Sequence, residues 1–161
     1  MTVQLSPHFT LDEFINSTTA QRNGINNTPS PEVVVALQAL VDHVIEPIRV
    51  AVNVPITIDS GYRCPILNAL IGGQPSSQHQ ALGGKAAAAD LKTPKMTALQ
   101  LANAILQIKD LPFDQLLLEF HSPSQPTSGW VHVSYSLEGP PRKMVLTIDR
   151  SGTRIGLDPK G

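Results

Sequence analysis

The chain contains 161 residues, of which 41% are hydrophobic and 16% charged, and its net charge at pH 7 is −1. A chain of this length and composition is expected to fold as one domain spanning residues 1–161 and to bury a core. Because it has no run of lysine and arginine, we expect neither nucleic acid nor a membrane as a partner. We also expect the protein to be a monomer. The N-terminus lacks the basic start and the apolar stretch of a signal peptide, so synthesis in the cytoplasm is expected.

Two helices are predicted in the first third of the chain. Thr10 and Glu13 form a capping box, which opens a short helix. Ser30 followed by Pro31 begins a second helix, in which apolar residues recur at helical spacing. We expect Pro47 to kink this helix or to end it near residue 49, because proline lacks the backbone donor that a helix requires.

Two further helices are predicted. A turn over residues 61–65 leads into a short helix that stops at residues 72–73, which are both glycine. Another helix begins at Thr97, where Gln100 completes a second capping box.

Strands are predicted mainly in the second half of the chain. The strand-like segments are residues 55–60, 115–120, 130–136, 144–149 and 153–157, the last two forming a hairpin. Helices before strands are typical of an α+β fold, so we expect an antiparallel sheet flanked by helices.

The five histidines fall in different contexts. His43 is interpreted as structural or solvated, His8 as packing the N-terminal segment, and His121, in a loop rich in serine and proline, as exposed. Strand alternation places His132 on the same face as Trp130, where it can point into a cleft.

A metal site can be assembled from residues of three segments. Catalytic zinc is held by three protein ligands and keeps one open position for water. His79, Asp90 and His132 can supply two imidazoles and one carboxylate. Glu119, in a strand beside three leucines, is the candidate base that accepts the proton from the activated water.

Arg63 lies at the end of a predicted strand, where a fixed guanidinium can bind a substrate carboxylate or stabilise an oxyanion. A surface arginine is the alternative interpretation. Cys64, the only cysteine, excludes an intramolecular disulfide, and we interpret it as a small buried thiol rather than a nucleophile.

Several of these residues lie in motifs that resemble the zinc D-Ala-D-Ala carboxypeptidase family, most closely its short, often phage-encoded or prophage-encoded branch. The motifs, in chain order, are residues 5–14, 60–68, 72–73, 77–79, 89–91, 113–116 and 130–134. Each is moderately specific alone, but their shared order makes the resemblance strong, and it covers roughly residues 5–150.

The resemblance implies the fold shared with the Hedgehog signalling domain, with zinc in a groove. It implies His79, Asp90 and His132 as zinc ligands and Arg63 as a residue that faces the substrate; we add Ser77 as a second substrate-binding residue. It also implies a zinc peptidase that cuts peptidoglycan stem peptides, either as a D-Ala carboxypeptidase or as an endopeptidase between L-Ala and D-Glu.

The sequence departs from the family pattern at two points. Many members carry the base three residues before the last ligand, a position that is Gly129 here, so we assign the base to Glu119. Eleven positions separate His79 from Asp90, where the family usually has about seven. The intervening Gly/Ala-rich segment either bulges out as a loop and leaves the site intact, or displaces Asp90.

Two other functions stay open at this point. The fold can serve as a catalytically weak or inactive binding or structural module, because a fold does not determine function. The chain can also be a cytosolic dipeptidase for free D-Ala-D-Ala. If the cell wall is the substrate, the missing leader suggests release during phage lysis, as an endolysin, or carriage on a virion.

Overall fold

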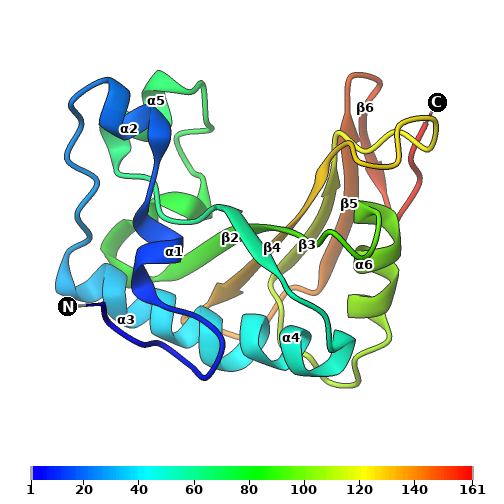
Figure 1. The fold of residues 1–161 in the computed structure, drawn as a ribbon, viewed down its shortest axis with the longest axis horizontal. Coiled ribbons are helices and arrows are strands. Elements are labelled where there is room, and N and C mark those ends of the chain that lie inside the picture. The colour runs from blue at the N-terminus through cyan, green and yellow to red at the C-terminus, as the bar shows by residue number, and fades with distance from the viewer. Residues whose placement is uncertain (1, 161) are drawn as a thin grey trace.

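Six strands form one mixed sheet in the order β1-β2-β4-β3-β5-β6 in the computed structural model, which describes residues 2–160 (Figure 1). The strands are β1 Thr57–Ser60, β2 Ala86–Lys92, β3 Gln115–Glu119, β4 Trp130–Ser136, β5 Met144–Asp149 and β6 Gly152–Ile155. Neighbouring strands are antiparallel except β3 and β5, which are parallel. The prediction of a wholly antiparallel sheet is therefore wrong at this pair. After β4 the chain returns as β5 on the side of β3 that faces away from β4. The alternation of residues within a single strand does not reveal which strands pair.

Helices flank the sheet, as predicted. They are α1 Leu11–Ile15, α2 Thr18–Arg22, α3 Pro31–Leu40, α4 Glu46–Val52, α5 Pro65–Leu70 and α6 Ala98–Leu106, with a π-helical turn η1 Val41–Ile45 and two 3₁₀ turns, η2 Gln78–Gln80 and η3 Leu82–Gly84. The capping residues are confirmed: Glu13 accepts from the backbone of Thr10, and Thr97 and Gln100 cap each other. None of the described helices is long and apolar enough to cross a bilayer.

The second predicted helix continues past Pro47, so of the two outcomes expected there, a kink or an end near residue 49, the end does not occur. It runs through α3, η1 and α4 to Val52, and the left-handed Asn53 terminates it. The π turn lies directly before the proline, and there the backbone N–H of Glu46 donates to the carbonyl of Val41. The wider turn accommodates the proline, which cannot donate to the preceding turn.

The Gly/Ala-rich segment after His79 does not form a single bulging loop that extends as far as Ala89. Residues 86–92 form β2, which pairs with β4 on one side and β1 on the other. Ala87 and Ala89 are buried against the helical layer, where α3 packs on β2. Alanine has a low intrinsic preference for strands, so pairing and close packing decide the conformation here.

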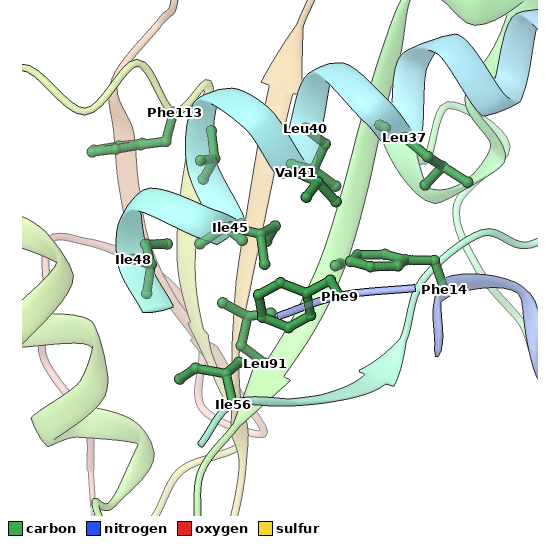
Figure 2. Close-up of a cluster of buried hydrophobic side chains, with 14 of the residues drawn as sticks. Phe9, Phe14, Leu37, Leu40, Val41, Ile45, Ile48, Ile56, Leu91 and Phe113 are labelled. Carbon is green, nitrogen blue, oxygen red and sulfur yellow. The ribbon is translucent and has the colours of Figure 1, made fainter. Parts of the chain in front are cut away.

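The hydrophobic core lies between the sheet and the long helix. Figure 2 shows side chains of that helix, including Leu40 and Ile45, gathered with Phe9, Phe14 and Leu91. Alternate residues of β2, β3 and β4 face this core, so the intervening residues of the same strands face the opposite side of the sheet. That opposite face carries the polar residues described below.

Leu37 and Val35 of α3 give a direct test of this packing. Leu37 is 1% exposed and Val35 is 61% exposed. Replacing Leu37 with alanine is expected to lower the free energy of unfolding by about 2–5 kcal/mol, because it leaves a cavity under the sheet. Val35→Ala should change it by less than about 0.5 kcal/mol. Urea unfolding of both variants would measure the difference, and equal effects would contradict the assigned core.

Candidate metal centre

Three side chains converge on the polar face of the sheet, and they are the three predicted metal ligands. The Nε2 atom of His79 lies 3.2 Å from Oδ1 of Asp90 and 3.1 Å from Nδ1 of His132. The third edge of the triangle, from His132 Nδ1 to Asp90 Oδ1, is 3.2 Å. A tetrahedral zinc ion with ligands at about 2.0–2.1 Å separates its ligand atoms by about 3.3 Å. All three residues are buried, and their ligand atoms match this separation.

Strand pairing fixes two of the three ligands. Asp90 on β2 and His132 on β4 are direct cross-strand partners, and both face away from the core. The suggestion that the longer segment after His79 displaces Asp90 is therefore wrong. Ser60, the last residue of β1, is also opposite Asp90, so β1 brings residues 61–63 to the same place.

A backbone carbonyl orients the third ligand, His79. Its Nδ1 lies 2.7 Å from the carbonyl oxygen of Gly61, so Nδ1–H donates this bond and Nε2 presents a lone pair to the other two residues. Gly61 must be glycine, because a Cβ there would lie 2.4 Å from the carbonyl oxygen of Phe14 in α1. The short contact between the turn and α1 thus holds the imidazole in place.

The charges of the centre suit a cation. Burial opposes ionisation of Asp90, but the two histidines outweigh it and hold the pKa of this carboxyl well below its usual range. Lone pairs of a carboxylate and two imidazoles that face one another at about 3 Å repel unless a proton or a metal ion lies between them. The donor set, two nitrogens and one oxygen, is one that zinc binds in catalytic sites.

Glu119 lies beside this triangle. Its Oε1 is 3.8 Å from Nδ1 of His132, and the side chain is only 18% exposed, so Glu119 is not a solvent-exposed carboxylate on the strand. Burial raises the pKa of Glu119, although His132 and Arg63 oppose the shift. The position three residues before His132 cannot carry a side chain here, because a Cβ on Gly129 would lie 2.4 Å from the carbonyl oxygen of Glu119.

The backbone around Arg63 is fixed on both sides. Its N–H donates to the carbonyl of His79 at 2.9 Å, while the buried amide of Asn27 binds the carbonyl of Tyr62 and the N–H of Cys64. The Nε atom of Arg63 is buried and has no hydrogen-bond partner among the described residues. Burial lowers the pKa of this guanidinium, and the nearby carboxylates Asp90 and Glu119 counteract the shift. A donor is therefore available beside the triangle.

The three ligand candidates, Glu119 and Arg63 line one groove with a volume of about 790 Å³. The predicted site residues that line it are Arg63, Ser77, His79, Asp90, Glu119 and His132. Ser77 also caps the η2 turn, since its hydroxyl accepts from the N–H of His79 at 3.3 Å. At the Glu119 end, the rings of Phe120 and Trp130 contact each other with centroids 5.5 Å apart.

Sequence reasoning missed a buried hub at the other end of the groove. The carboxylate of Asp114 accepts hydrogen bonds from the backbone N–H, Nε and Nη2 of Arg142 and from Nε2 of Gln78. Gln78 directly precedes His79, so Asp114 ties the turn that carries a ligand to the start of β3. The motif over residues 113–116 contains Asp114, and it was the only indication in the sequence that this residue matters. Its partner Arg142 lies in a loop that carries no motif and no periodic pattern.

The remaining histidines lie outside the groove. The prediction that His121 is exposed is wrong: the side chain is buried, and its Nδ1 donates to the carbonyl of Ser128 at 3.0 Å. The loop folds back over it, which composition alone does not indicate. His43 is exposed on the helix and stacks on Tyr135, and His8 pairs with a glutamate at the start of α4.

The pH dependence of stability should reveal the Asp114 hub. The bonds from Arg142, opposed in part by burial, lower the pKa of Asp114 to about 2. The carboxyl is 3% exposed, and its unfolded pKa is about 3.9, so ionisation contributes about 2–3 kcal/mol at pH 7. That contribution is lost as the pH falls from about 4 through 2.

The test is the free energy of unfolding of wild type and Asp114→Asn at pH 7 and at pH 2. The difference between the two proteins should shrink by about 2 kcal/mol at the lower pH. Asp59→Asn is a suitable control, because Asp59 pairs with Lys92 on the surface, where such pairs contribute little. A difference that is the same at both pH values would contradict the role of Asp114.

Comparison with known proteins agrees with the geometry. The family model described as Peptidase M15 matches residues 7–134, which is most of the chain and includes Arg63, Glu119 and the three ligand candidates. A search of curated proteins found no match. The resemblance to the zinc D-Ala-D-Ala carboxypeptidase family is confirmed by the family model, and the chain belongs to the peptidase M15 family.

Proposed function

We propose that this protein is a zinc-dependent peptidase that hydrolyses peptidoglycan stem peptides, either as a D-Ala-D-Ala carboxypeptidase or as an L-Ala–D-Glu endopeptidase. One observation carries the proposal: a buried triangle of two imidazoles and a carboxylate, with edges of 3.1–3.2 Å, lies beside a second carboxylate in one groove. Membership of the M15 peptidases supports the metallopeptidase chemistry.

His79, Asp90 and His132 would hold the metal. Zinc, when bound, supplies Lewis acidity that polarises a carbonyl and makes water a nucleophile at neutral pH. The carbonyl of Gly61 keeps the imidazole of His79 in the tautomer that presents Nε2, and the ionised Asp90 supplies negative charge. These residues position the site without taking part in proton transfer.

Glu119 would act as the general base and then as the acid. Its carboxylate accepts the proton of the attacking water and passes it to the leaving amine. Burial raises its pKa, and a carboxylate with a raised pKa is a stronger base that holds the accepted proton nearer neutral pH, until it passes it to the leaving amine. Arg63 would bind the terminal carboxylate of the substrate or the oxyanion that forms during attack.

The inactive-module alternative loses its main support. It depended on the longer segment between His79 and Asp90, yet that segment forms a strand that presents Asp90 to both histidines. An enzyme on the cell wall would reach its substrate during phage lysis or on a virion. It would act as a monomer, because one chain supplies the whole groove.

Metal content gives the first test. Protein purified without a chelator or a metal-affinity tag is expected to hold about one zinc ion per chain by mass spectrometry. His79→Ala should lose the metal on dialysis, since it removes one of three ligands. His43→Ala should keep it, because His43 is exposed on the helix outside the groove. A protein that takes up no zinc even when zinc is added would contradict the proposal.

Replacing the proposed base separates chemistry from structure. Glu119→Gln should lower kcat by about 10²–10⁴-fold and retain zinc, because the ligands are unchanged. Glu138→Gln is the matched control, since Glu138 lies outside the groove and pairs with the exposed Lys85. Hydrolysis would be followed by release of new amino groups from purified cell wall. Full activity in Glu119→Gln would exclude Glu119 as the base.

A further inference from the structure

We propose that Arg142 binds a carboxylate on the peptide substrate, two to three residues from the bond that is cut. This inference rests on the proposed function, because it concerns the substrate of the same groove. Arg142 lines the groove but lies beyond residue 134, where the match to the family model ends. The inference therefore concerns a feature of this chain that the matched region does not include.

The guanidinium of Arg142 is held rigidly by Asp114. Its Nε donates to both carboxylate oxygens at 3.0 Å and its Nη2 to Oδ2 at 2.6 Å, and the backbone N–H of Arg142 adds a third donor at 3.0 Å. Gln78 supplies a further donor to the same carboxylate at 2.8 Å. The position of the guanidinium is thus set before a substrate binds, which reduces the entropy lost on binding.

One donor group of Arg142 remains for a ligand. Nη1 makes no hydrogen bond to any described residue, and the side chain is 52% exposed in the wall of the groove. Asp114 is 3% exposed, so it does not present its own charge to a ligand in the groove. A charged, planar donor of this kind binds carboxylates in preference to neutral acceptors.

Strand register places the residue that anchors this donor, Asp114, relative to the metal centre. His132 on β4 is opposite both Asp90 and Leu117, so Leu117 marks the level of the centre on β3. Asp114 lies three residues before Leu117, and a strand rises about 3.3 Å per residue, so Arg142 is anchored about 10 Å along the groove. Glu119 and the aromatic pair lie in the other direction.

This distance selects for longer substrates. An extended peptide covers about 10 Å in three residues, so a chain with its cleaved bond at the centre can bring a group two to three residues away to Arg142. A free dipeptide cannot reach that far. The groove is therefore suited to an acidic oligopeptide, and the dipeptidase interpretation is disfavoured.

A positional scan of synthetic peptides tests the proposal. The peptides share one cleaved bond and carry either a carboxylate or the corresponding carboxamide one, two or three residues away. Wild-type, zinc-loaded protein should prefer the carboxylate by about 10-fold to 100-fold in kcat/KM, mainly through KM, at two or three residues and not at one. In Arg142→Gln the preference for the carboxylate over the carboxamide should disappear.

Arg154→Gln is the matched control, because Arg154 forms a comparable pair with Asp149 but does not line the groove. Calorimetry on zinc-loaded Glu119→Gln would compare the affinities of the carboxylate and carboxamide peptides in a protein that does not cleave them and that keeps Arg142. Absence of a preference there, or a preference that persists in Arg142→Gln, would overturn the proposal. A preference in binding without any hydrolysis by wild type would support the role of Arg142 and contradict the peptidase function.

Discussion

The antiparallel pairing of β2 with β4 is the constraint on which the candidate site depends. It sets Asp90 directly opposite His132 and points both side chains away from the core. A shift of one residue in this register would turn one ligand into the core and bring an alanine or a valine to the groove in its place. The buried alanines of β2 and the valines of β4 oppose such a shift, because it would turn those of one strand away from the core under the long helix. Core packing and metal geometry are thus determined by the same strand pair.

The remaining ligand depends on the N-terminal part of the chain. α1 contacts the turn after β1 so closely that only glycine fits at position 61, and the carbonyl of that glycine orients His79. Asn27 binds the backbone on both sides of Arg63 from a loop far away in the sequence. The short helices and loops before residue 31 therefore act as a support for the site, although none of their side chains is proposed to touch the substrate.

Much of this could be predicted from the sequence where local signals are strong. Capping residues marked the starts of α1 and α6, alternation marked β3 to β6, and the motifs selected the residues that converge in the groove. The errors arise where tertiary contacts decide the outcome. β2 begins with four alanines, which carry no strand signal of their own, and β5 pairs with β3 across the return of the chain. The Asp114 hub joins three segments that are distant in the sequence, so no single window contains it.

The lack of space at Gly129 has an evolutionary consequence. The proposed base is carried by β3, whereas the resemblance implies that many relatives carry it three residues before the last ligand. A mutation that introduced a carboxylate at position 129 would force its Cβ against the backbone of residues 119 and 121, and the left-handed conformation at 129 would disfavour it further. The two arrangements are therefore separated by a rearrangement of the β3–β4 loop, not by a single codon change. Lineages that carry the base on β3 and lineages that carry it just before β4 should also differ in the length and shape of that loop.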